Sequence, residues 1–110
     1  EAKKIEIEGE GAYEGLRLQL NDLISVKADD NYVEVTYVVD GKLKKQLIRN
    51  TLKNVEAMVP ELLRTHRSYL INPEHFQQFK TENGKLFLQL AYELVIPVTK
   101  TYTKEVKARF

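Results

Sequence analysis

The sequence predicts a mostly β fold of the β-rich α+β class: small antiparallel sheets with one short internal helix and a C-terminal helical turn. Most of the chain alternates apolar with polar residues at a period of two, which is typical of half-buried strands. The dipeptides Asp40-Gly41 and Asn83-Gly84 are strong signals for tight hairpin turns. Apolar residues recur with helical spacing in only two segments, so helix is the minor component.

Four strands are expected before residue 40. Segment 5–8 alternates Ile with Glu, and segment 16–20 alternates Leu with Arg or Gln. Segments 24–28 and 32–39 are rich in β-branched and aromatic residues, which favour strands. Between them, Asp29-Asp30-Asn31 is a cluster of turn-forming residues.

The later strands are arranged around the two hairpin turns. A type I′ loop needs positive φ at both central residues, which Asp40-Gly41 and Asn83-Gly84 supply. Pro97 falls near the end of the last strand and indicates a sheet edge, because proline cannot donate a ladder hydrogen bond. The expected strands are 43–49, 76–80, 85–90 and 94–98.

Two helical segments are expected. The first is capped by Asn50 or Thr51 and ends before Pro60, which disfavours a helical residue in front of it. The second is a helical turn capped by Thr99 or Thr101. The apolar faces are Leu52, Val55, Met58 and Val59 in the first, through about residue 59, and Tyr102, Val106 and Phe110 in the second.

Length and composition indicate one domain, residues 1–110. The chain has 110 residues, of which 43% are hydrophobic and 30% charged, a balance that argues against disorder. Without cysteine there are no disulfides, thiolate nucleophiles or Cys-based metal sites, and the chain suits a reducing cytosol. We expect a cytoplasmic protein, or one held on the cytoplasmic side of a membrane. Because the chain begins with Glu1 instead of Met, we expect it to be cut from a longer protein.

The net charge of +1 hides a strong asymmetry. Residues 1–40 carry four Lys/Arg against ten Asp/Glu, a net charge of −6. Residues 41–110 carry thirteen Lys/Arg against six Asp/Glu, a net charge of +7. The split favours separate acidic and basic faces, and a basic face can bind phosphates.

Enzyme chemistry has little support. Neither a GxGxxG nor a Walker-type loop is present, and the two histidines, His66 and His75, lack the spacing of a helical metal pair. A pairing of His66 with Ser68, as in a small hydrolase, is the weakest hypothesis, and Asp29-Asp30 is most simply a turn. We therefore expect no catalytic residue, metal or cofactor.

Two basic segments have plain structural explanations. The first is a solvated strand face that also discourages edge-to-edge aggregation, an interpretation we favour over phosphate binding. The second is an amphipathic helix whose C-terminal end favours cations. Their residues are Lys42, Lys44, Lys45, Arg49 and Lys53 in the first, and Lys100, Lys104, Lys107 and Arg109 in the second.

Segment 64–72, Arg-Thr-His-Arg-Ser-Tyr-Leu-Ile-Asn, is more informative. It places two arginines, a histidine and two hydroxyls just before an apolar stretch, and the planar guanidinium suits phosphates and base edges. The alternative is a strand in which His66 is structural and Asn72-Pro73 begins a turn. We assign His66 mainly to structure, because in a strand its neighbour Arg67 points to the opposite face.

Five segments in this order resemble the LytTR family of bacterial DNA-binding output domains. The Arg-x-His-Arg-Ser-Tyr-x-x-Asn block is the most specific of them, and the resemblance covers roughly residues 16–110. The segments are 23–33, Asp40-Gly41, Thr51-Leu52-Lys53, 64–72 and 96–102.

The resemblance implies the DNA-binding domain of a bacterial transcriptional regulator of the two-component response-regulator type. It implies that loops, instead of a recognition helix, enter two successive major grooves of double-stranded DNA and contact the minor groove between them, usually at direct repeats. It also implies a missing N-terminal receiver or sensor domain, and it allows a homodimer on DNA.

Site residues follow from the resemblance position by position. The first major-groove loop matches Asp30-Asn31-Tyr32, with Asn31 or Tyr32 as the base contact, and Arg67 matches the minor-groove residue. Lys100 matches the second major-groove residue, and Lys85 is a weaker backbone candidate. The flanking phosphate ligands are Thr99 and Thr101.

Two departures from the family pattern bear on recognition. Many members have Ser-Arg where this chain has Thr99-Lys100, and lysine lacks the fork that makes arginine selective for guanine. The acidic pair Asp29-Asp30 is unfavourable near phosphates and is explained by fixing the turn. The rival hypothesis is a β-rich protein-interaction or autoinhibitory module that keeps the fold and does not bind DNA. DNA binding requires that Asn31, Arg67, Lys85 and Lys100 converge on one positive face.

Overall fold

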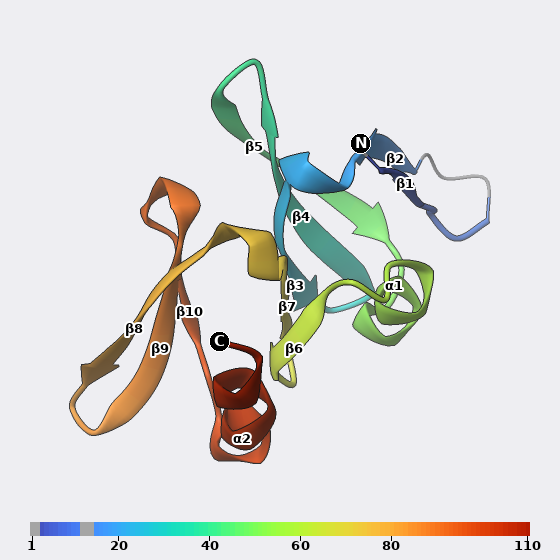
Figure 1. The fold of residues 1–110 in the computed structure, drawn as a ribbon. Helices are drawn as coiled ribbons and strands as arrows, with labels where there is room; N and C mark the ends of the chain where they lie inside the picture. Colours follow the sequence, from blue (N-terminus) through green and yellow to red (C-terminus); the bar gives the residue numbers. More distant parts are fainter. Residues whose placement is uncertain (1–2, 12–14) are drawn as a thin grey trace.

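The computed structural model describes residues 3–11 and 15–110, which form ten strands and two α-helices (Figure 1). The strands are β1 (Lys4–Ile7), β2 (Leu16–Gln19), β3 (Leu23–Asp29), β4 (Tyr32–Val39), β5 (Lys42–Arg49), β6 (Leu63–His66), β7 (Tyr69–Ile71), β8 (Phe76–Glu82), β9 (Lys85–Leu90) and β10 (Val95–Pro97). The helices are α1 (Leu52–Met58) and α2 (Lys100–Arg109). None of the helices formed by the described residues is long and apolar enough to cross a membrane.

The strands form three antiparallel sheets, which confirms the predicted fold class. The largest has the order β5-β4-β3-β7-β6, the second β10-β9-β8, and the third is the β1–β2 hairpin. In Figure 1 the five-stranded sheet lies between the three-stranded sheet and the β1–β2 hairpin. β10 is an edge strand, as Pro97 indicates.

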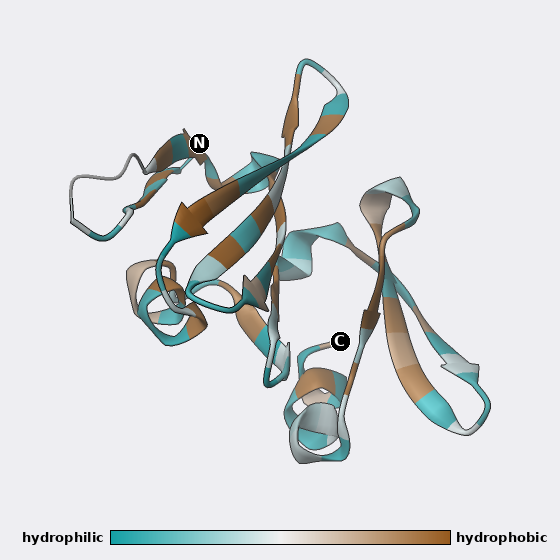
Figure 2. Ribbon diagram, turned by 180° about the vertical axis from the view of Figure 1, so that it is seen from behind, coloured by the Kyte–Doolittle hydropathy of each residue, from teal (hydrophilic) through white to brown (hydrophobic). Residues whose placement is uncertain are grey.

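Two hydrophobic cores lie on opposite faces of the five-stranded sheet. One packs the sheet against α1 and the β1–β2 hairpin, and the other packs it against α2 and the three-stranded sheet. Successive side chains of a strand point to opposite faces, so in β7 Leu70 belongs to the first core and Ile71 to the second. Figure 2 shows brown and teal bands along the central strands, where hydrophobic and hydrophilic residues follow one another.

The hairpin turns have the backbone that their residues predict. φ is 51° at Asp40 and 75° at Gly41, and 52° at Asn83 and 75° at Gly84. The β3–β4 tip contains Asp30 at φ 55°. Aspartate and asparagine tolerate this left-handed region better than most side chains, so these residues direct the chain back at each tip.

The internal helix differs in detail from the prediction. Thr51 is the cap, since its hydroxyl accepts a hydrogen bond from the Asn54 N–H at 3.2 Å, whereas Asn50 is buried. Met58, which the sequence places on the same apolar face as Leu52 and Val55, is 37% exposed. At about 100° per residue it lies on the rim of the face that Leu52 and Val55 centre.

The C-terminal segment is a ten-residue helix instead of a single turn. Thr99 occupies the N-cap position without a side-chain capping bond, and Thr101 lies inside the helix. Val106 is buried in the second core, and the Phe110 ring stacks on the Phe76 ring at 3.9 Å. These contacts explain why the helix continues to Arg109.

Segment 64–72 is not one strand. Residues 67 and 68 form a turn between β6 and β7, so the expectation that Arg67 points away from His66 across a strand is wrong. Most of the predicted strands also differ from the observed ones by one or two residues at an end: Leu20, for example, falls in a single-turn 3-10 helix, Leu20–Asp22, and Leu94 precedes β10.

The N-terminal hairpin is fastened to the rest of the chain by specific contacts. The Asn50 side-chain amide donates to the Glu8 carbonyl at 2.7 Å, and the Glu10 N–H donates to the Arg49 carbonyl at 2.7 Å. Lys3 forms an ion pair with Glu61, and this hydrogen-bonded ammonium lowers the pKa of the Glu61 carboxyl. The hairpin is therefore part of the fold.

Candidate nucleic-acid interface

One end of the five-stranded sheet gathers two polar turns. β3 pairs with β4 on one side and with β7 on the other, so the β3–β4 tip and the β6–β7 turn are neighbours. Asp29 is opposite Tyr32 at the tip, and the Ala28 N–H donates to the Ser68 carbonyl at 2.8 Å. Asn31 in the tip and Arg67 in the turn are both exposed.

The β6–β7 turn is held from both sides. The Arg64 guanidinium Nη1 donates to the Arg67 carbonyl at 2.7 Å. The Ser68 N–H donates to His66 Nδ1 at 2.9 Å, so that ring nitrogen is an acceptor and the proton of the neutral ring is on Nε2. The backbone that carries Arg67 is therefore fixed while its side chain remains in solvent.

The start of α2 is joined to this end of the sheet through β6. The Thr99 N–H donates to the Thr65 carbonyl at 3.0 Å, next to His66. Beside this contact is a surface hollow of about 650 Å³ between β9, β10 and α2. The polar side chains that line it belong to His66, Lys85, Thr99, Lys100 and Thr103.

The interface is mainly basic, with one acidic corner. Arg67, Lys85 and Lys100 are exposed, and Arg49 at the end of β5 lies against the Tyr32 ring with 5.8 Å between guanidinium carbon and ring centroid. Asp29 and Asp30 are also exposed, next to the tip. Anions are attracted most strongly to Arg67, Lys85 and Lys100, which lie on the side of the β6–β7 turn and the hollow.

The predicted site residues fall into two adjoining groups. Asn31, Tyr32 and Arg67 lie at one end of the sheet, and Lys85, Thr99 and Lys100 line the hollow. Thr101 is exposed on the first turn of α2 and is not among the residues lining the hollow. In Figure 1 the β6–β7 turn and the start of α2 lie together at the lower side of the molecule, and the β4–β5 tip lies at the top.

Sequence reasoning missed how Arg64 and His66 support the turn. Both contact its backbone, although the two arginines of the motif look alike in sequence. In the sequence, the only signal was the position of these two residues on either side of Thr65. The structure shows that Thr65 is fully buried. That position predicts proximity to Arg67 but does not predict which group each side chain contacts.

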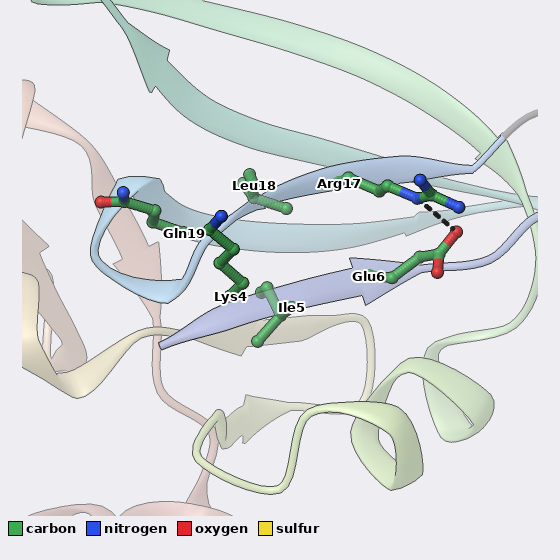
Figure 3. A pocket seen from close by; sticks show the side chains of 6 residues that line it. All are labelled: Lys4, Ile5, Glu6, Arg17, Leu18 and Gln19. Atoms are coloured by element: carbon green, nitrogen blue, oxygen red, sulfur yellow. Dashed lines mark hydrogen bonds and ion pairs between the residues drawn. The ribbon is translucent and has the colours of Figure 1, made fainter. Parts of the chain in front are cut away.

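A second hollow lies over the N-terminal hairpin, in a different sheet from the interface (Figure 3). Arg17 Nε donates to Glu6 Oε2 at 3.2 Å across the two strands, and both side chains are exposed. Such a surface ion pair contributes little to stability, typically about 0–1 kcal/mol. This hollow presents no group suited to catalysis beyond that pair.

The proposed hydrolase pair has an unsuitable geometry. His66 Nδ1 is occupied by the Ser68 backbone N–H, at 2.9 Å, and does not serve as a base toward the Ser68 hydroxyl through that nitrogen. Among the residues that the structure describes, no three His, Asp or Glu side chains gather as a metal site requires.

An antiparallel β domain that presents basic loops along one side has the charge distribution expected of a nucleic-acid-binding domain. The family model of the LytTr DNA-binding domain matches residues 14–110. The chain belongs to this family, which confirms the resemblance seen in the sequence; a family of DNA-binding domains is not an enzyme class.

Two relatives are transcriptional regulatory proteins named BtsR. The one from Escherichia coli K12 is 36% identical over 91 residues, which are 82% of this chain and 36% of that protein. The one from Salmonella typhimurium is 35% identical over the same extent. The chain thus spans about a third of the length of these relatives.

A solved LytTr DNA-binding domain from Bacillus cereus has the same fold. It superposes with a TM-score of 0.72 over 97% of this chain and 94% of that chain. Only 14% of the residues are identical, so this likeness concerns the fold alone.

Proposed function

We propose that the chain is the sequence-specific DNA-binding domain of a bacterial transcriptional regulator of the response-regulator type. Family membership and the similarity to BtsR support this function. The observation that carries it is the row of three polar sites: the β3–β4 tip, the β6–β7 turn and the start of α2. Hydrogen bonds from Ala28 to Ser68 and from Thr99 to Thr65 connect the row.

In this proposal each site reads one groove. Asn31 or Tyr32 enters a major groove, Arg67 enters the next minor groove, and Lys100 enters the following major groove. The molecule is 43 Å along its longest axis, longer than the ~34 Å between successive major grooves on one face of B-DNA. An interface that runs along this axis is long enough to reach both grooves.

Phosphate contacts come from the neighbouring groups. Thr99 and Thr101 flank Lys100 at the positive end of the α2 dipole, where phosphates are favoured. Lys85, across the hollow, supplies a further backbone contact. These contacts set the register of the protein on the duplex, and the three groove residues supply the sequence preference.

The wider protein is also part of the proposal. The chain spans 36% of the BtsR length, and the proposal places a receiver or sensor domain N-terminal to it. We expect a direct-repeat operator, two copies on DNA and a cytoplasmic location, with no metal or cofactor needed for binding.

Salt dependence is the first test. Each neutralised phosphate contributes a slope of about −0.9 in log K against log[salt], and we expect roughly four to eight phosphates. Fluorescence anisotropy of the domain with an operator duplex and with a random duplex measures the slope and the preference. Affinity independent of salt, or equal affinity for any duplex, contradicts the proposal; no binding at all favours an interaction module.

Arg67→Ala and Lys45→Ala are expected to differ. Arg67 enters the minor groove, where narrow A·T-rich stretches concentrate negative potential, so its loss costs about 1–3 kcal/mol and alters the preference for central base pairs. Lys45 is exposed on β5, 3.8 Å from Glu34, and its loss changes binding little. Titrations of both variants with an operator duplex and with a random duplex measure these losses of affinity. If both variants lose the same affinity, and lose it equally on the two duplexes, the interface lies elsewhere.

Lys100 tests the departure from the family pattern. Lys100→Ala is expected to lose about 1–3 kcal/mol on the cognate duplex, concentrated at one base pair. Lys100→Arg is expected to retain or tighten binding, because the guanidinium engages guanine bidentately. Stability stays within about 0.5 kcal/mol in both variants, since Lys100 is exposed. The measurement is a titration of each protein against duplexes that differ from the operator at one base pair. If Lys100→Ala binds all of these duplexes with the same affinity as the unmodified domain, Lys100 makes no base-specific contact.

A further inference from the structure

We propose that Arg64 is a positioning residue for Arg67, and that Glu56 of α1 holds Arg64 in place. The inference rests on the proposed function, because it concerns how the minor-groove side chain is presented. It makes α1, which carries none of the proposed reading residues, a determinant of sequence preference.

The two arginines of the motif have opposite surroundings. The Arg64 side chain is 16% exposed, and its terminal nitrogens are both used: Nη1 donates to the Arg67 carbonyl at 2.7 Å and Nη2 to Glu56 Oε1 at 2.9 Å. Arg67 is exposed. One guanidinium thus faces the protein, and the other is available to DNA.

The Arg64 contact acts on the residue that carries the reader. The other two hydrogen bonds of the turn, from Ala28 and to His66, involve Ser68. Among the hydrogen bonds within residues 3–11 and 15–110, it is the Arg64 bond that holds the peptide carbonyl of Arg67 itself, and with it the direction in which the Arg67 side chain leaves the backbone. A side chain aimed by the backbone loses less freedom on binding.

Arginine is suited to this role and lysine is not. A guanidinium has donors at fixed angles and bridges a carbonyl and a carboxylate at once, whereas an ammonium is a single point donor. Arg64 Nε is buried and makes no hydrogen bond within the described part of the chain, so the two terminal contacts fix its plane. Replacement by lysine keeps the charge and removes the bridge.

The chain offers a matched control in the Arg17–Glu6 pair of Figure 3, an exposed ion pair in a different sheet. Arg64→Lys and Glu56→Gln are compared with Arg17→Lys and Glu6→Gln, and Arg67→Ala is the reference for loss of the reader. Each variant of the 110-residue chain is titrated against an operator duplex and against variants of its central base pairs, at several salt concentrations. Urea denaturation of each variant checks that it is folded.

Arg64→Lys is expected to lower the discrimination among central base pairs roughly tenfold, approaching that of Arg67→Ala, with no change in salt slope, because no phosphate contact is lost. Glu56→Gln is a milder change, because the glutamine side chain keeps an oxygen that accepts a hydrogen bond from Arg64. We expect it to lower the discrimination among central base pairs roughly threefold. The two control variants leave it unchanged.

Three outcomes overturn the inference. In the first, Arg64→Lys and Glu56→Gln are folded and keep the discrimination among central base pairs, while Arg67→Ala loses it. That result means that Arg64 does not position Arg67, and it leaves the proposed function standing. Equal loss on all central base pairs shows a general structural role. Unchanged discrimination in Arg67→Ala contradicts the proposed function itself, and the inference with it.

Discussion

The position of β3 in the middle of its sheet is the constraint on which the candidate interface depends. Because β4 and β7 both pair with β3, the tip that carries Asn31 and the turn that carries Arg67 must lie at the same end of the sheet. The hydrogen bond from Ala28 to Ser68 fixes their spacing. β6 extends the row to Thr99 and the start of α2. The arrangement of the proposed reading residues thus follows from strand order, and the loops need no recognition helix to hold them.

Two cores make this end of the sheet rigid. α1 and the β1–β2 hairpin cover one face, and α2 and the three-stranded sheet cover the other, so the sheet is supported on both sides. In the proposed interface the same two helices take part: α2 through Lys100 at its first position, and α1 through the Glu56–Arg64 ion pair. Packing and the proposed recognition are coupled, because the elements that bury the sheet also orient its turns.

Local turn chemistry made most of the fold predictable from sequence. Asp40-Gly41 and Asn83-Gly84 specify hairpins through their own backbone preferences, whatever surrounds them. Arg67-Ser68 lacks such a signal, and that turn depends on tertiary contacts from Arg64 and His66, so it was mistaken for strand. The length of α2 likewise depends on the distant Phe76 ring. The residue types of the site could be predicted from the motif, but the partners of its side chains could not, because they come from α1, from β5 and from the backbone of the β6–β7 turn.

The most direct test of a single DNA-binding face is an amide chemical-shift titration of the isotopically labelled domain with an operator duplex. The account predicts that the signals of Asn31, Arg67 and Lys100 shift together as one binding event, while those of Gly41, at the far end of β4, stay where they are. Shifts centred on the Gly41 tip, or at only one of the three reading residues, would contradict it.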